Sequence, residues 1–173
     1  MLFQGAEDRI WCAPFRRNRR ELMSLFKLAD DSEQQILSYL YRGEVLFASQ
    51  SGQPLGHALI LEQEVPDILE LKSIAVVEWR QGQGIGGMLL NAVVRYCRRQ
   101  EAKTLRVSTS IADSQALGFY LRHGFRASVI VRDVFTAEHG YPKYAEDSRI
   151  PLNDALELEL VLSTVPASKR KTS

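Results

Sequence analysis

Four glycines within six residues constrain the fold of this chain more than any other feature. They are Gly82, Gly84, Gly86 and Gly87, and they separate an apolar stretch at 68–77 from a segment whose apolar residues recur at helical spacing. Glycine loses more backbone entropy on folding than any other residue, so this density predicts a compensating gain in geometry. N–H groups at a helix N-terminus attract phosphate when no side chains shield them. The chain is therefore predicted to bind an anion where a strand passes into a helix.

The glycine turn formally matches the G-x-G-x-x-G pattern of dinucleotide-binding proteins. That pattern is expected in the first strand-helix unit of a parallel sheet, followed by an acidic ribose contact. Here the turn lies in the middle of the chain, after a predicted antiparallel hairpin at 44–50 and 55–63, and the acidic contact is missing. A Walker loop is excluded because no Gly-Lys-Ser or Gly-Lys-Thr follows the glycines. From the residues alone, an anion-binding turn and a tight corner without a ligand both remain.

The rest of the sequence alternates between helical and strand periodicity. Apolar spacing and capping residues predict helices at 19–29, 32–42, 85–99 and 113–123, and strands at 44–50, 55–63, 68–77, 104–110, 125–135 and 155–163. The second of these helices is expected to bury Ile36, Leu37 and Leu40.

This order of elements predicts a single domain over 1–165 of the α+β class, in an α/β/α arrangement. Its central sheet is expected to be mixed and mostly antiparallel, with about six or seven strands and with helices on both faces. The basic segment at 166–173 is predicted to be a disordered tail. The segment 136–154 lacks periodicity and exceeds a normal connection in length, so it is a candidate to line a ligand site.

Composition excludes several classes of protein. With 45% apolar and 25% charged residues, this chain of 173 residues is neither disordered nor fibrous. A formal net charge of +1 gives no reason to expect nucleic acid or a membrane as a partner. The cluster Arg16, Arg17, Arg19 and Arg20 is interpreted as the solvated start of a helix. No apolar run approaches the roughly 18 residues that a membrane span needs, so a cytoplasmic location is expected.

The sequence predicts no metal site. Cys12 and Cys97 are too few and too far apart for a metal site or a disulfide framework, and they are interpreted as buried thiols in a reducing compartment. The histidines His57, His123 and His139 have no partner at metal-ligand spacing, so they are interpreted as structural.

Two sequence motifs resemble those of one protein family. The stretch Gln81-Gly82-Gln83-Gly84-Ile85-Gly86 is similar to the Gln/Arg-x-x-Gly-x-Gly/Ala signature of the GNAT superfamily, the acyl-CoA-dependent N-acetyltransferases, and residues 74–76 stand where the family's central strand precedes it. The stretch 116–125 resembles a second family element, A-x-x-x-Y-x-K-x-G-F. The resemblance extends from about residue 44 to residue 135, and 132–142 also resembles a bacterial branch of largely uncharacterised members.

The resemblance implies that acetyl-CoA is the acetyl donor. Its pyrophosphate would bind the backbone N–H groups of the glycine turn, and its pantetheine would pair with the strand backbone. Gln81 is neutral where arginine is common in the family. Asp113 stands where relatives often carry asparagine, and a carboxylate can accept but not donate a hydrogen bond. The cofactor-binding residues that the resemblance implies are Ile74, Ala75, Val76, Gln81, Gly82, Gln83, Gly84, Ile85, Gly86, Gly87, Asp113, Tyr120 and Arg122.

The resemblance also implies two catalytic residues. Tyr120 falls on the family's general-acid tyrosine, whose hydroxyl protonates the leaving thiolate. Glu70 falls where several relatives carry the glutamate that takes the amine proton. Alternation along the strand would place Glu70, Lys72 and Ile74 on one face, near the acetyl group. The alternatives are a tyrosine that only packs in its helix and a solvated strand glutamate.

The predicted activity is the transfer of an acetyl group from acetyl-CoA to a primary amine of a small molecule, directly within a ternary complex. Two alternatives remain: acetylation of a protein or peptide amine, and a non-catalytic acyl-CoA-binding module that needs neither catalytic residue. The long loop indicates a covered pocket, and its acidic residues are candidates to attract a cationic amine. These residues are Glu138, Glu146, Asp147 and Asp154. Relatives often form homodimers, so a homodimer is one candidate assembly.

Overall fold

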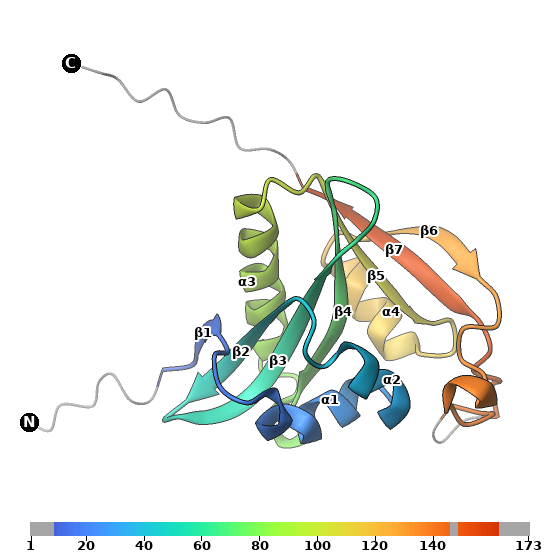
Figure 1. Cartoon of the computed structure of the whole chain (residues 1–173), viewed down its shortest axis with the longest axis horizontal. Helices are drawn as coiled ribbons and strands as arrows, with labels where there is room; N and C mark the ends of the chain where they lie inside the picture. Colours follow the sequence, from blue (N-terminus) through green and yellow to red (C-terminus); the bar gives the residue numbers. More distant parts are fainter. Residues whose placement is uncertain (1–8, 146–148, 163–173) are drawn as a thin grey trace, which may run out of the picture.

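A seven-stranded sheet forms the centre of the computed structural model, which describes residues 9–145 and 149–162 (Figure 1). The strand order is β1-β2-β3-β4-β5-β7-β6, and all neighbouring pairs are antiparallel except β4 and β5. The strands are β1 (Trp11–Pro14), β2 (Glu44–Gln50), β3 (Gln53–Glu62), β4 (Ile68–Val76), β5 (Thr104–Ser110), β6 (Arg126–Val131) and β7 (Ala155–Val161). The helices are η1 (Arg19–Leu22), α1 (Met23–Ala29), α2 (Glu33–Tyr39), η2 (Glu78–Arg80), α3 (Ile85–Arg99), α4 (Ser114–Arg122) and η3 (Ala137–His139), of which the η elements are 3-10 turns.

Two apolar cores lie on opposite faces of this sheet. One core forms beneath α1 and α2, where Phe26 and Ile36 are fully buried. The other forms beneath α3 and α4, where Leu89 and Val93 are fully buried. Burial of such side chains contributes roughly 1.5–3 kcal/mol each. The mixed, mostly antiparallel sheet with helices on both faces is therefore confirmed (Figure 1).

Several local predictions were wrong. Leu37 is 47% exposed rather than buried, because α2 turns Ile36 toward the core and a helix rotates about 100° per residue. The helix predicted at 19–29 begins with the 3-10 turn η1, and the strand predicted to reach 135 ends at Val131. The strand β1 and the short turn η3 were not predicted. The tail predicted at 166–173 lies outside the described residues.

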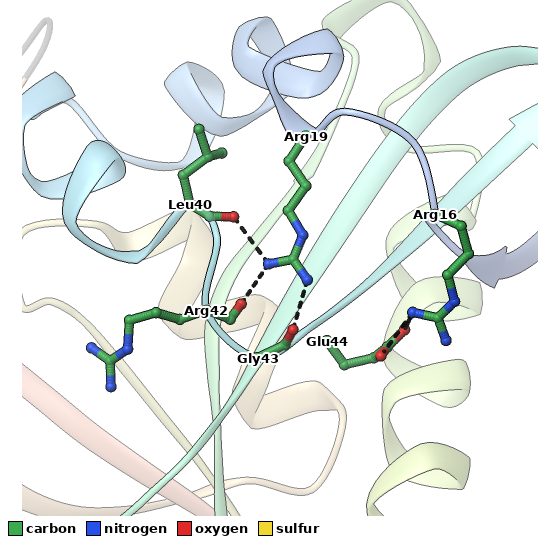
Figure 2. Close-up of polar contacts among 6 residues, drawn as sticks. All are labelled: Arg16, Arg19, Leu40, Arg42, Gly43 and Glu44. Atoms are coloured by element: carbon green, nitrogen blue, oxygen red, sulfur yellow. Dashed lines mark hydrogen bonds and ion pairs between the residues drawn. The ribbon is translucent and has the colours of Figure 1, made fainter.

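Arg19 forms hydrogen bonds to the segment that connects α2 to β2 (Figure 2). Its guanidinium donates to the carbonyl oxygens of Leu40 at 3.0 Å, Arg42 at 2.6 Å and Gly43 at 2.6 Å. The last carbonyls of a helix have no partner within the helix, so the bond to Leu40, the C-cap residue of α2, satisfies one of these groups. Beside this clamp, Arg16 donates to Glu44 at 2.8 Å. The interpretation of the cluster as solvated therefore fails at Arg19, which is bonded to three carbonyl oxygens, whereas the Arg16 side chain is 68% exposed and pairs with Glu44 at the surface.

The strand β4 loses its partner β5 halfway along. The parallel ladder joins Ile68–Leu71 to residues 104–107 and ends there, while β4 continues to Val76 and β5 to Ser110. On its other edge, β4 stays paired with β3 as far as Val76. The second half of β4 therefore has one backbone edge that no strand of the described sheet occupies.

One extra residue interrupts β4 at the same place. Leu59 and Ile60 are adjacent in β3, but they pair with Ser73 and Leu71, so Lys72 is left over as a β-bulge. A bulge reverses the alternation of side chains beyond it. It therefore changes which residues of β4 can reach the same face of the sheet.

Candidate active site

A pocket of about 470 Å³ lies at the C-terminal end of β4, between the glycine turn, α4 and the last turn of α1. It brings together twelve of the predicted cofactor-binding residues. These are Ile74, Ala75, Val76, Gln81, Gly82, Gly84, Ile85, Gly86, Gly87, Asp113, Tyr120 and Arg122. Gln83 does not line this pocket, and its side chain instead donates to the carbonyl oxygen of Trp79 at 3.3 Å.

The glycines of the turn divide into two pairs with different functions. Gly82 and Gly84 have φ angles of +72° and +82°, and a Cβ at either position would have open space around it. They are needed for the left-handed backbone, which other residues adopt at a cost. Gly86 and Gly87 allow α3 to approach the side chains of α4 closely. A Cβ at Gly86 would lie 3.3 Å from the Phe119 ring, and one at Gly87 would lie 3.2 Å from the His123 imidazole.

The N-terminus of α3 presents free N–H groups to the pocket. Gly84 is the N-cap residue, and no side chain caps the helix there. The first N–H groups of a helix lack partners within the helix, and the helix dipole adds partial positive charge. The turn therefore has the geometry that the sequence predicted for an anion site.

Gln81 closes the turn onto the strand. Its side-chain amide donates to the carbonyl oxygen of Val76 at 3.0 Å. The amide is neutral and already bonded, so Gln81 adds no charge to the pocket.

The backbone at Ile74, Ala75 and Val76 is paired on one edge only. These residues pair with Ala58, His57 and Gly56 of β3, whereas the pairing of β4 with β5 has ended before them. An open strand edge can accept an extended ligand through main-chain hydrogen bonds. This edge leads from the glycine turn toward Tyr120, since all three lie in one pocket.

Tyr120 lies in α4 and is only 6% exposed. Its ring packs edge-on against Phe119 at 5.3 Å and Phe125 at 5.4 Å. Burial, assisted by the negative charge of Asp113, raises the pKa of its phenol well above the usual value. Tyr120 therefore stays protonated throughout the neutral range, as an ordinary tyrosine does, and the raised pKa makes its phenol a weaker acid.

Asp113 caps the helix that carries Tyr120. One of its carboxylate oxygens accepts the N–H of Ala116 at 2.8 Å, which is the N-cap role that the sequence allowed. Arg122 lies at the other end of the same helix. Both residues line the pocket from the α4 side.

Glu70 lies in a different pocket from Tyr120. This second pocket, of about 460 Å³, is lined by β4, the end of β3 and α2. The Glu70 carboxylate accepts from Gln63 at 2.7 Å and lies 3.8 Å from the Lys72 ammonium. The expectation that Glu70 and Ile74 share a face was wrong, because the bulge at Lys72 turns Ile74 into the core under α3 and α4.

A buried polar chain supports the opposite face of β4. His57 is fully buried, its Nε2 lies 2.8 Å from the Ser73 hydroxyl, and its ring packs on Phe26. Burial lowers the pKa of His57 to about 3, so its imidazole is neutral. Ser73 is also hydrogen-bonded to Tyr39, whose hydroxyl donates to Asp30 at 2.8 Å. The structural interpretation of His57 agrees with this arrangement.

The long loop after β6 contacts the segment between α1 and α2, where Asp30 and Ser32 lie. Tyr141 is hydrogen-bonded to Asp30, and the Ser32 hydroxyl donates to the carbonyl oxygen of His139 at 2.6 Å. The loop therefore contacts the junction of α1 and α2, beside which it is drawn in Figure 1. Of its acidic residues, Glu146 and Asp147 lie outside the described residues.

The pocket also contains residues that the sequence motifs did not identify. Leu28, Arg80, Phe119 and His123 line it. Arg80 directly precedes the signature motif, so its position in the sequence could have indicated it. Leu28 lies in α1, and only the tertiary structure brings it to this pocket. Within residues 9–145 and 149–162, no group of three or more His, Cys, Asp or Glu side chains is arranged to hold a metal ion.

Comparison with known proteins identifies the family. Residues 5–125 match the acetyltransferase (GNAT) family, and the chain therefore belongs to it. It is 30% identical over 142 residues to the uncharacterised N-acetyltransferase YvbK of Bacillus subtilis, which covers 82% of this chain and 90% of that protein. None of the helices in the described part of the chain has the length and apolar character to span a membrane.

Two solved structures share the fold and contain the expected cofactor. A GNAT family acetyltransferase from Elizabethkingia anophelis with acetyl-CoA bound has a TM-score of 0.80 and 30% identity, covering 90% of this chain and 99% of that one. A Bacillus subtilis acetyltransferase in complex with CoA has a TM-score of 0.79 and 28% identity, covering 90% of this chain and all of that one. The open turn, the unpaired strand edge and the buried tyrosine of this chain fit such a cofactor.

Proposed function

We propose that this protein transfers an acetyl group from acetyl-CoA to a primary amine of a small molecule, with both bound at once. One observation carries the proposal: a single pocket joins uncapped N–H groups, an unpaired strand edge and a protonated, buried tyrosine. Acetyl-CoA, when bound, supplies the thioester. We further propose that residues 1–165 form the single catalytic domain.

The residues on the cofactor side would divide the work as follows. N–H groups of the turn at 82–87 would hold the diphosphate, and the backbone at Ile74–Val76 would hold the pantetheine. An N–H on this edge would also polarise the thioester carbonyl, a role that does not depend on side-chain identity. Tyr120 would give its proton to the leaving thiolate and regain one from solvent.

Glu70 is proposed to take the proton that the amine loses on attack. It lies on the α1 and α2 face, so the acceptor would approach from that face and meet the acetyl group where β4 and β5 diverge. The hydrogen bond from Gln63 and the nearby Lys72 ammonium hold the Glu70 carboxylate in place in this pocket.

Calorimetry with acetyl-CoA tests the first half of this proposal. Binding to the full chain is expected, and its absence would disprove the whole proposal. Release of free thiol with a panel of amines then tests the second half. The panel contains alkyl monoamines, diamines, amino sugars and a peptide with a free N-terminus.

The pattern across that panel separates the remaining alternatives. Thiol release with small amines alone supports the proposal. Release with the peptide alone would replace the small molecule by a protein or peptide acceptor. Binding of acetyl-CoA without thiol release from any amine would leave a non-catalytic acyl-CoA-binding module.

A further inference from the structure

Arg80 is a cation of the cofactor pocket that has no ion-pair partner among the described residues. It ends η2, two residues before the first glycine of the turn, and it lines the pocket. One of its terminal nitrogens donates to the side chain of Gln50 at 2.8 Å, and its guanidinium lies 5.3 Å from the centre of the Trp79 ring. No carboxylate of a described residue lies within ion-pair distance of it.

The hydrogen-bonding capacity of Arg80 is also incompletely used. Its Nε is inaccessible to solvent and has no partner among the described residues. A guanidinium carries five N–H donors in a planar fork that matches phosphate and carboxylate oxygens. Buried donors without partners are rare and costly. The N–H groups that can meet an anion in the pocket are those on the terminal nitrogens of Arg80, one of which donates to Gln50.

The neighbouring residues identify the chemistry of that anion. Arg80 adjoins a turn shaped for a diphosphate, and the turn has no cation of its own, because the Gln81 amide is neutral and bonded to Val76. We propose that Arg80 binds a phosphate of the CoA donor and that Gln50 positions its guanidinium. This inference rests on the proposed use of acetyl-CoA and adds a residue outside the family signature.

Arg80 suits this role better than the other arginine of the pocket. Arg122 has an exposed side chain that lies over Gly118, where an added Cβ would be 3.0 Å from its Nη1. The Arg80 side chain is instead held by Gln50 on one side and by the Trp79 ring on the other. A side chain fixed before binding loses less conformational entropy when the ligand arrives.

Calorimetry with CoA and with dephospho-CoA tests the proposal on the full chain. Arg80→Gln is expected to weaken CoA binding about tenfold to hundredfold, as loss of a charge-assisted hydrogen bond does. Arg80→Lys keeps the charge without the fork, so it should lose less. The difference between wild type and Arg80→Gln should shrink in about 1 M salt. Arg98→Gln is the matched control, since it removes the same charge from the far end of α3.

The two ligands distinguish which phosphate is bound. Equal losses for CoA and dephospho-CoA would assign Arg80 to the diphosphate, which its place beside the turn favours. A loss for CoA alone would assign it to the 3′-phosphate. Both results support a phosphate contact.

Gln50→Leu tests the positioning role. It should weaken CoA binding in the wild-type background and have no further effect in Arg80→Gln.

Unchanged CoA affinity in both Arg80→Gln and Arg80→Lys, with wild-type protein that binds CoA, would overturn this inference and leave the proposed function intact. Failure of the wild type to bind CoA would instead count against the proposed function. Thermal unfolding of each variant verifies folding, and Arg80→Lys keeps the test available if Arg80→Gln does not fold.

Discussion

The two halves of β4 form two different kinds of site from one continuous strand. Residues Ile68–Leu71 pair with β3 and β5 on both edges, and the polar pocket beside them is built from side chains such as Glu70 and Lys72. Residues 73–76 pair with β3 alone, and the pocket beside them exposes backbone and glycine. A single bulge thus separates the part of β4 beside a pocket of charged side chains from the part with an open backbone edge.

The difference shows how a sheet can offer a backbone edge in its interior. Edge strands are normally at the border of a sheet, where they invite unwanted pairing. Here the edge is opened in the middle, because β4 and β5 stop pairing while each remains paired to its outer neighbour. A ligand can therefore take the place of a missing ladder at an edge inside the sheet.

The largest expected effect concerns Tyr120, which lies in the pocket beside the second half of β4. Tyr120→Phe keeps the ring packing against Phe119 and Phe125 but removes the proton donor. The turnover number should fall roughly hundredfold to thousandfold, as for loss of a general acid. Acetyl-CoA affinity, measured by calorimetry, should change less than about twofold. Unchanged turnover would remove Tyr120 from the acid role.

A pH effect on stability tests how the second half of β4 is held. His57, which contacts Ser73, has a pKa of about 3 in the folded protein against 6.5 when exposed. Between these values the unfolded chain binds a proton that the folded chain does not, so stability is full above about pH 6.5 and is lost as pH falls. At pH 4.5 the loss is about 2–3 kcal/mol, at about 1.4 kcal/mol per pH unit.

Denaturant unfolding at pH 6.5 and 4.5 measures this loss. His57→Phe should flatten the change because it removes the titrating group, while His139→Asn, at an exposed histidine, should retain it. The same pH dependence in wild type and His57→Phe would contradict the assignment to His57.

Glu70→Gln tests the charged half of the strand. The turnover number should fall about tenfold to hundredfold if Glu70 takes the amine proton, with acetyl-CoA affinity unaffected. Glu62→Gln removes a charge from the same pocket without altering β4, and it should change turnover much less. Equal effects of the two substitutions would assign only an electrostatic role to the pocket.

The smallest expected effect concerns the turn. Gly84→Ala places a side chain on a backbone with φ of +82°, which costs about 1–2 kcal/mol of stability. Gly52→Ala does the same at φ of +79° in the hairpin between β2 and β3. Both should lower the unfolding free energy, but only Gly84→Ala should also weaken acetyl-CoA binding, by a few-fold. Equal acetyl-CoA affinity in the two variants would show that the turn does not contact this ligand.

The order of elements and the turn could be predicted because their signals are local. Glycine density, capping residues and apolar period all act within one or two turns of chain. The bulge at Lys72 could not be predicted, because it depends on the register of β4 with β3. The prediction that Glu70 and Ile74 lie on the same face of the sheet failed for this reason. The same holds for Arg19, whose partners lie more than twenty residues away.

The contacts at Asp30 and Ser32 have a consequence for the order of folding. The Ser32 hydroxyl meets the carbonyl of His139, 107 residues along the chain, and Tyr141 reaches Asp30 across a similar separation. Contacts so distant in sequence form only after the intervening chain has been closed, which costs entropy before it is repaid. The residues that line the two pockets lie between positions 28 and 123, so neither pocket includes this loop. We therefore expect the loop to dock on the junction of α1 and α2 last, after both pockets have formed.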